Sequence, residues 1–511
     1  RINSSNRLEW EFEQSHYEQI GVNFYSVLAS DGPSNVNRRL VLPAVVDGTR
    51  NITRQPDSQP GVFDGITGSV RLKHQLDDGW MWRTQYGTQR LRADDRLTYA
   101  SGCQTSHPTN KQTDSFCLAP NANGPLNNGD FEIHDFRSDN ERRQSEAVHT
   151  ELSGQTELGG LSHNIKFSLM RQRYVKRMPY AAADTLLGST NSTYGGLNPP
   201  SGATQYWPNT NAKDYSTEIA FNDHLRLTKA TSGWLGLRHT QLNRTSIMTN
   251  GDARVKDERG VTTPWLALSH QLNANYLVYT SYSEGLETQS APSASSYTNS
   301  GQPLPALRSK QREVGLKNQH ERAQWQVTWF DITRPATADT GVCDTTVGSC
   351  TRQIDGQAHH QGLELSANNT INRWSVGGSA MWLDAKRENA TVQSELNGQH
   401  PINVPQYILR GMAEYRFASM PGLRSGLRLS REGERNVTNK EDGDIKLPAW
   451  TTVDATSHYD TKVNHVASTW TLAIHNLANK HYWRESPKQY GQYFLYPGAP
   501  RTVRATVQFH L

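Results

Sequence analysis

Hydrophobic and polar residues alternate with a period of two along most of the chain. Near the start, Leu8, Trp10 and Phe12 are separated by charged residues, so an extended strand would place apolar side chains on one face and charges on the other. The alternation persists to the last residues, where it includes Val503 and Phe509. Helical periodicity is nowhere comparably clear, so the pattern predicts β-strands throughout.

The predicted connections between these strands alternate between short and long. Turn-forming sequences occupy 77–79, 159–160, 229–233, 273–275, 321–323, 372–373, 420–422 and 462–466. Long polar segments occupy 20–64, 97–131, 181–213, 249–261, 289–308, 340–351, 390–406, 437–449 and 486–500. Short periplasmic turns and long external loops are typical of outer-membrane barrels. A large secreted β-sandwich or propeller is the alternative, but it gives no reason for loop length to alternate.

Composition narrows the class of β protein. Hydrophobic residues make up 35% of the 511 residues, and no stretch approaches the roughly 20 apolar residues of a membrane-spanning helix. A barrel tolerates this polar average because only every second residue of a strand faces lipid. The 13 Trp, 20 Tyr and 12 Phe argue against disorder, and the scattered net charge of +4 does not predict nucleic-acid binding. We predict an all-β, transmembrane antiparallel β-barrel of about 18 strands.

The period of two also predicts which side chains face the lipid. Because side chains alternate strictly along a strand, one error in register would turn the whole apolar set inward. The set predicted to face lipid is Leu8, Trp10, Phe12, Trp325, Val327, Trp329, Val503, Val507 and Phe509.

Four cysteines form two pairs that are close in sequence, and both pairs fall in long predicted loops. Four cysteines allow three connectivities, and proximity favours Cys103 with Cys117 and Cys343 with Cys350. Each disulfide would staple one external loop after passage through an oxidising periplasm. A four-thiolate metal site is the alternative, but the sequence has no CxxC spacing and the site would need two distant loops to meet.

Catalytic signatures are absent from the sequence. We find no GxSxG elbow, HExxH motif, phosphate-binding glycine loop or dinucleotide fingerprint. The adjacent His359 and His360 would point to opposite faces of a strand, so they do not predict a metal site. We therefore expect no enzyme activity, no cofactor and no metal site. A barrel enzyme such as a lipase or protease remains the weakest alternative.

Aromatic residues in the long loops are the first candidates for ligand binding. Aromatic residues near strand ends could instead belong to the interfacial aromatic girdle. Those deep within a loop could form an apolar surface that contacts a metal chelate. Tyr206 and Trp207 are the preferred candidates because they fall mid-loop. The other aromatic candidates are Tyr194, Tyr297, Tyr490 and Tyr493, and the cations predicted to line the lumen and steer an anionic ligand are Arg410 and Arg428.

An ordered set of motifs in the C-terminal half resembles the barrel of TonB-dependent siderophore receptors of the outer membrane. The order of the motifs is that of the family, with weaker likeness from Arg7 onward. The motifs are YLVYTSYSEGLE (Tyr276–Glu287), LPALRSKQREVGLK (Leu304–Lys317), FDITRP (Phe330–Pro335), DGQAHHQGLE (Asp355–Glu364), Val404–Tyr407, LPAWTTVD (Leu447–Asp454), IHNLANKHY (Ile474–Tyr482) and GAPRTVRATV (Gly498–Val507).

The resemblance implies an outer-membrane receptor, a monomer in lipid, that imports a ferric siderophore when the TonB complex acts on its plug domain. Iron would be carried only within the bound siderophore. The family barrel has about 22 strands, so the plug and about four strands are expected to lie upstream of Arg1 or to have been removed. Residues 1–511 would then supply the barrel wall and loops but not energy coupling. A passive porin or sugar channel is the alternative, and the upstream sequence, a plug or a signal peptide, would distinguish the two.

Overall fold

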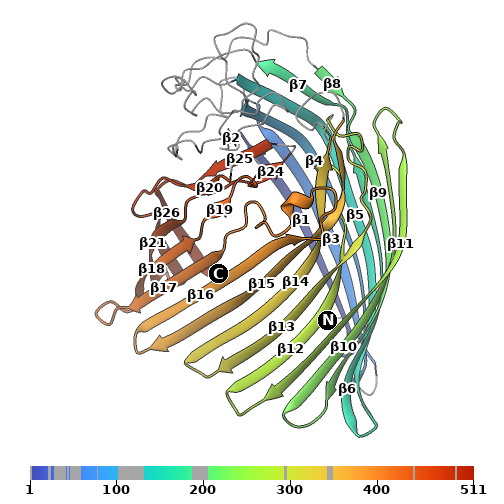
Figure 1. Ribbon diagram of the computed structural model, residues 1–511. Helices are drawn as coiled ribbons and strands as arrows, with labels where there is room; N and C mark the ends of the chain where they lie inside the picture. The colour runs from blue at the N-terminus through green and yellow to red at the C-terminus, as the bar shows by residue number, and fades with distance from the viewer. Residues whose placement is uncertain are drawn as a thin grey trace.

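The computed structural model forms one large antiparallel sheet that curves into a barrel wall (Figure 1). Twenty strands share this sheet, and the only helical element among the described residues is the 3-10 turn η3 (Ser394–Leu396). The structure describes residues 3–20, 25–27, 42, 45, 59–76, 79–101, 132–186, 205–292, 296–341, 349–440, 444–489 and 492–510.

Long strands joined as hairpins make up the wall. Their bounds are β1 (Asn6–Gln19), β3 (Gly61–Gln75), β4 (Met81–Ser101), β5 (Glu132–Leu158), β6 (Leu161–Arg177), β9 (Thr210–Arg226), β10 (Thr231–Met248), β11 (Val255–Gln271), β12 (Tyr276–Glu287), β13 (Leu307–Gln319), β14 (Ala323–Thr340), β15 (Thr351–Ile371), β16 (Trp374–Glu388), β17 (Tyr407–Arg416), β18 (Leu423–Glu432), β21 (Trp450–Val463), β22 (Val466–His475) and β26 (Thr502–His510). The short strands β7 (Ala181–Leu186) and β8 (Gln205–Trp207) complete the sheet, with β7 paired to β5.

Without β7 and β8, eighteen of the twenty strands follow one another in the wall, which confirms the predicted strand number. The alternation of short turns and long connections is confirmed as well, and the short turns gather at one end of the barrel (Figure 1). In the described part of the chain, β1 pairs only with β3 and β26 only with β22. No pairing there joins β1 to β26.

The predicted lipid-facing residues lie on one face of the wall. Trp10 is 75% exposed, and its neighbours across the next strands are Val70, Tyr86 and Val148, so the register builds a continuous apolar row. Val503, Val507 and Phe509 are likewise exposed, and Trp325, Val327 and Trp329 share one face of β14. The opposite face is largely polar, with Glu9, Glu11 and Glu13 on β1, so the apolar face is the one that meets lipid.

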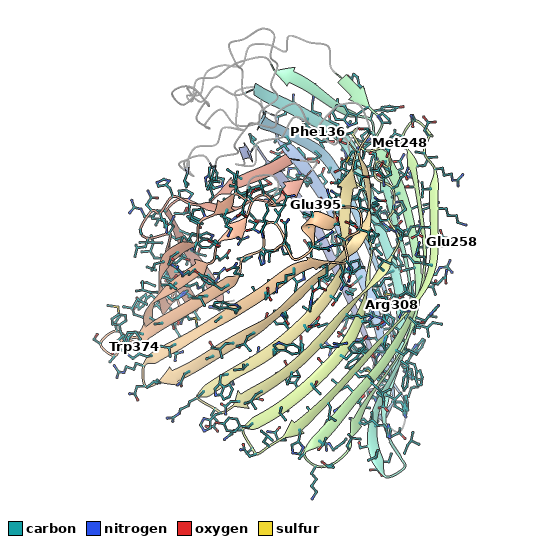
Figure 2. All side chains as sticks on the ribbon, in the orientation of Figure 1. Phe136, Met248, Glu258, Arg308, Trp374 and Glu395 are labelled. Carbon is teal, nitrogen blue, oxygen red and sulfur yellow. The ribbon has the colours of Figure 1, made fainter. Side chains whose placement is uncertain are left out.

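Aromatic rings line the end of the wall that carries the short turns. Trp374 lies beside one of these turns (Figure 2), and its ring centroid is 4.9 Å from that of Tyr415. The ring centroids of Tyr415 and Phe417 are 5.2 Å apart. Those of Tyr276, at the start of β12, and Trp325, near the start of β14, are 6.0 Å apart. Such a row is the expected girdle at a membrane interface.

The long connections lie at the end of the barrel opposite the short turns. They fold back and bury apolar side chains of their own. Small strands order this region: β2 (Tyr25–Val27), β19 (Arg435–Asn436), β20 (Lys446–Leu447), β23 (Trp483–Glu485), β24 (Lys488–Gln489) and β25 (Gln492–Pro497). Val437, Leu447, Trp483 and Leu495 are each at most 2% exposed. The sequence reads as polar loops here, but apolar side chains within them pack together.

Candidate ligand-binding site

Three motifs of the sequence meet at Asn476, directly after β22. The backbone N–H of Asn476 donates to the Asp454 carboxylate of β21 (2.8 Å). Its side-chain amide donates to the carbonyl oxygens of Lys480 and Ala499 (both 2.9 Å), and its side-chain oxygen accepts the Lys480 N–H (2.9 Å). Asn476 has a positive φ of 50°, which asparagine tolerates better than most residues. This residue therefore fixes the direction in which the 476–501 segment leaves the wall.

Asp355 and Gly356 anchor a second long segment, the connection after β16. The Asp355 carboxylate is fully buried and accepts backbone N–H groups from Thr391 (2.7 Å), Val392 (2.9 Å) and Gln393 (3.1 Å). Gly356 has a φ of +64°, and a Cβ there would lie 2.3 Å from the Glu388 carbonyl oxygen. Both residues that open the DGQAHHQGLE motif thus have a structural role. Asp355 accepts the backbone N–H groups of the connection, and Gly356 allows the backbone of Glu388 to approach closely.

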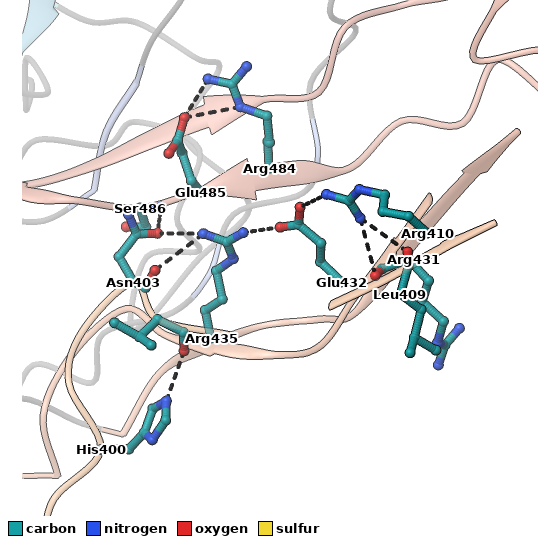
Figure 3. A network of polar contacts seen from close by, with 11 residues as sticks. His400, Asn403, Leu409, Arg410, Arg431, Glu432, Arg435, Arg484, Glu485 and Ser486 are labelled. Atoms are coloured by element: carbon teal, nitrogen blue, oxygen red, sulfur yellow. Dashed lines mark hydrogen bonds and ion pairs between the residues drawn. The ribbon is translucent and has the colours of Figure 1, made fainter. Parts of the chain in front are cut away.

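These anchored segments surround a polar network on the inner face of the wall (Figure 3). Arg410 of β17 donates to Glu432 of β18 (2.5 Å), and Arg435 forms an ion pair with the other oxygen of the same carboxylate. Arg435 also donates to the Asn403 carbonyl oxygen (3.2 Å), and the Asn403 side chain accepts the Ser486 N–H (2.8 Å). Glu432 thus joins the wall to Arg435, and Arg435 in turn joins the connections that contain Asn403 and Ser486.

An aromatic surface lies next to this network. The rings of Trp450 and Tyr482 lie 4.6 Å apart, and the Arg410 guanidinium is 6.0 Å from the Trp450 ring. The Trp450 Nε1 and the Arg435 Nε are buried without a hydrogen-bond partner among the described residues. This part of the inner wall therefore combines apolar rings with the positive charge of Arg410, which suits a ligand that carries both apolar surface and acceptor oxygens.

Arg410 and Arg428 both point to the inner face, as predicted, but their surroundings differ. Arg410 is held by Glu432, whereas Arg428 is exposed and makes no hydrogen bond or ion pair with a described residue. Its cross-strand neighbours are Met412 and Asp454. Arg428 is therefore the better placed of the two to meet an anion.

Tyr206 and Trp207 do not lie in an irregular loop, which corrects the predicted mid-loop position. They belong to β8, where they pair with Ala182 and Ala181 of β7. Because side chains alternate along a strand, the two rings point to opposite faces. Tyr206 is 70% exposed, and Trp207 packs on Phe136 with ring centroids 6.2 Å apart, near the outer end of β5 (Figure 2).

Tyr297 is buried, with 3% of its surface exposed. Its hydroxyl donates to Asp339 (2.9 Å), and the Arg352 guanidinium lies 5.6 Å from its ring while binding the same carboxylate (2.6 Å). Burial, reinforced by the Asp339 charge, raises the pKa of Tyr297, so the hydroxyl stays a donor. In this structure the ring ties the 288–306 connection to the hairpin of β14 and β15.

Cys350 lies beside Tyr297 and is fully buried and disulfide-bonded. Cys103, Cys117 and Cys343 lie outside the described residues, so both disulfide pairings stay predictions. Tyr194 and Tyr490 also lie outside the described residues. Tyr493 belongs to β25, where its backbone pairs with Val27 and Lys488.

The inner network contains residues that sequence reasoning missed. Trp450, Glu432 and Arg435 were not selected because each looks like an ordinary strand-end residue in sequence. The only signal was that Trp450 belongs to the LPAWTTVD motif; Glu432 and Arg435 lie outside the motifs quoted above. Across the described ranges, no three His, Cys, Asp or Glu side chains are arranged to hold a metal ion, and no helix is long and apolar enough to cross a membrane.

Curated relatives match parts of the chain. The ferrichrome receptor FcuA of Yersinia enterocolitica is 30% identical over 210 residues, which are 41% of this chain and 26% of the relative. The metal-pseudopaline receptor CntO of Pseudomonas aeruginosa (strain UCBPP-PA14) is 28% identical over 155 residues, which are 30% of this chain and 21% of the relative. The matched segments thus span about a quarter or less of these relatives.

Solved structures share the fold over almost the whole chain. The ferric preacinetobactin receptor BauA of Acinetobacter baumannii superposes with a TM-score of 0.77 at 19% identity, covering 99% of this chain and 70% of that one. The siderophore receptor PiuA of the same organism gives a TM-score of 0.72 at 16% identity, covering 99% and 71%.

The family model described as "TonB dependent receptor-like, beta-barrel" matches residues 10–477, which is most of the chain. That family consists of outer-membrane receptors and transporters rather than a class of enzymes. The wall, its apolar outer face and its inward-folded loops agree with this match. The chain belongs to the TonB-dependent receptor-like β-barrel family of the outer membrane.

Proposed function

We propose that the protein binds a ferric siderophore at the inner wall near the outer end of the barrel and takes part in its uptake. The observation that carries the proposal is the juxtaposition of Arg410, Trp450 and Tyr482 on the inner face of the wall, a face that the unpaired Arg428 shares. The names of the relatives support it, since those proteins are receptors for ferrichrome, metal-pseudopaline and ferric preacinetobactin. Energy coupling through TonB and a plug domain belongs to the same proposal.

Arg428 should contribute to the affinity for an anionic ferric chelate. Replacing Arg428 with Gln removes an exposed charge that makes no ion pair with a described residue, so we expect affinity to fall about threefold to tenfold, or about 1 kcal/mol, with a weaker dependence on salt. Calorimetric titration of the full-length receptor with a panel of ferric siderophores measures the change.

A matched control for this experiment is Arg424→Gln. Arg424 lies on the same strand and face, but it is already paired with Asp460 (2.6 Å) near the short-turn end. It should leave affinity unchanged. Equal losses for both variants, or none for Arg428→Gln, would contradict the assignment of Arg428 to the ligand site.

Tyr206 and Trp207 stay candidates for ligand contact. Replacing both with Ala should weaken chelate binding by about 2 kcal/mol, because tyrosine and tryptophan supply large contact areas with few torsions to freeze. The single variants add a distinction, since the two rings face opposite sides of β8 and only the ring that faces the ligand should account for the loss. Intrinsic fluorescence, corrected for the lost Trp, or calorimetry measures it; unchanged affinity in the double variant would remove both residues from the site.

A further inference from the structure

The part of β11 nearest its hairpin with β10 has a free edge. β10 pairs with β11 up to Val255, at the tip of the hairpin. On the other side, β12 pairs with β11 only up to Trp265. Residues 255–263 therefore have a neighbouring strand on one side only, among the residues that the structure describes. In Figure 1 the hairpin of β10 and β11 rises beyond β12.

Pro264 explains why the pairing with β12 stops. Gln271 donates its backbone N–H to the Ala230 carbonyl oxygen beside β10 (2.7 Å), so odd-numbered residues of β11 bond β10 and even-numbered residues face β12. Pro264 is even-numbered and has no N–H to donate to β12. Beyond this point the connection after β12 turns inward, and Arg244 of β10 donates to its Gln289 carbonyl oxygen (3.1 Å).

The even-numbered residues between Pro264 and the tip turn both their N–H and their C=O groups to the free edge. These residues are Lys256, Glu258, Gly260 and Thr262. Their backbone groups make no hydrogen bond on that side with a described residue. Thr262 is half-buried and the other three are exposed, with Glu258 labelled in Figure 2. Unpaired groups at this spacing are a template for one further strand.

This edge is little protected against pairing. Proteins blunt exposed edges with charges, proline, bulges or short length. The pairing of β10 with β11 runs without a register shift. The charges here are paired within β11, Lys256 with Glu258 (2.7 Å) and Asp257 with Arg259 (2.8 Å). A partner strand therefore needs no particular charge.

The free edge lies outside the hydrocarbon layer. Leu266 is the last large exposed apolar side chain of β11 before the hairpin tip. With a strand rise of about 3.3 Å per residue and a tilt of about 45°, Thr262 lies about 9 Å and Lys256 about 23 Å further out than Leu266. The edge is therefore reached from the external medium.

A second copy of the receptor does not fit this edge. Two copies in one membrane would be related by a two-fold axis along the membrane normal. That axis reverses the direction of tilt, so two β11 strands would cross at about twice 45°, or about 90°. Strands that pair in a sheet are rotated by only about 20 to 25°. The partner must therefore be free to orient its strand, as a segment of a separate protein is.

We propose that the free edge of β11 binds an extended segment of a separate protein outside the cell by strand addition. Backbone hydrogen bonds supply the affinity, and alternate side chains of the segment meet the two faces of the sheet. Gly260 and Thr262 present little bulk and no charge on the outward face, so small and β-branched side chains suit the partner there. A proline facing β11 would be excluded because it lacks an N–H group.

The test uses the full-length receptor and a synthetic peptide with the sequence of Arg238–Ser246. This segment of β10 already pairs with residues 255–263 from the other side, so its side chains suit the faces of β11. Fluorescence anisotropy of the labelled peptide measures binding, and hydrogen exchange measures protection of the edge amides. The control peptide has the same sequence but is N-methylated at two neighbouring residues, so both of its edges lack a donor.

Two double variants of the receptor separate the backbone from the side chains. Glu258→Pro with Thr262→Pro removes two edge N–H groups but spares the pairing with β10, because these amides point away from β10. Glu258→Ala with Thr262→Ala is the matched control, since it changes the same side chains and keeps both N–H groups. Mobility on unheated gels checks that each barrel folds.

We expect the proline pair and the methylated peptide each to weaken binding at least tenfold, and the alanine pair to change it less than twofold. The amides of Glu258 and Thr262 should exchange rapidly in the free receptor and slowly with peptide bound. Absence of peptide binding, or equal losses in both variants, would overturn the proposal. Slow exchange in the free receptor would overturn it too, because the receptor's own chain would then cover the edge. If the proline pair does not fold, the methylated peptide decides, and its binding as tightly as the unmodified peptide would overturn strand addition.

Discussion

Replacing Asn476 with leucine should destabilise the receptor by about 3 to 5 kcal/mol, because two costs add at one buried position. The substitution removes the three side-chain hydrogen bonds to Lys480 and Ala499. It also places a residue with a bulky side chain at a φ of 50°, in the left-handed region that asparagine and glycine tolerate best. Since Asn476 is only 4% exposed, water does not replace the lost hydrogen bonds easily.

Asn476→Gly separates the two costs. Glycine adopts the positive φ freely but has no side chain to bond Lys480 or Ala499, so this variant should lose about 2 kcal/mol less than the leucine variant. Urea unfolding of the detergent-solubilised full-length receptor, followed by the mobility shift of the folded barrel on unheated gels, gives both values. A leucine variant within 1 kcal/mol of the wild type would show that the three hydrogen bonds do not hold the 476–501 segment.

The wall of the barrel is predictable from sequence because its determinants are local. Alternation of side chains sets the lipid-facing row, and short turns carry residues that adopt a positive φ, such as Gly159 (59°), Gly160 (74°) and Asn372 (55°). Neither signal depends on distant parts of the chain. The strand number and the order of short and long connections were therefore predicted correctly.

The inward-folded loops were not predictable in the same way, because the contacts that order them join residues far apart in sequence. Arg244 of β10 is 7% exposed and donates to the carbonyl oxygen of Gln289 (3.1 Å) and the hydroxyl of Ser290 (3.0 Å). No local pattern around Arg244 indicates that it holds the 288–306 connection. Such an arginine reads in sequence as one more polar residue of the lumen.

The residues of the candidate site also divide into those whose position follows from local sequence and those whose position depends on distant contacts. Arg428 was predicted to face the lumen because parity along β18 is local, and the structure places it there. Tyr206 and Trp207 were selected from the length of a polar segment, which does not reveal that β7 and β8 pair within it. The contact between Arg410 and Trp450 joins two strands and is visible only after the register of β17, β18 and β21 is known.

Asp355 should be the residue whose loss most disturbs the connection after β16. In Asp355→Ala, the backbone N–H groups of Thr391, Val392 and Gln393 lose their acceptor. Each buried unsatisfied group costs about 1 to 3 kcal/mol, although a loop can recover part of this cost by moving toward water. We expect the Asp355→Ala variant to lose about 3 kcal/mol or more of the free energy that keeps this connection folded.

Asp355→Asn is the matched control for this prediction. Asparagine keeps one carbonyl oxygen that can accept from Thr391 and Val392, but it presents an amide where Gln393 N–H needs an acceptor. The loss of stability of this connection in Asp355→Asn should be about half of the loss in Asp355→Ala. Because the carboxylate orders the loop rather than the wall, limited proteolysis within 389–406 should increase in Asp355→Ala while the barrel still migrates as folded on unheated gels. If Asp355→Ala were as resistant to protease as the wild type, the loop would be held by other contacts. Of the Asp-Gly pair, only Gly356 would then be needed for the structure of this connection.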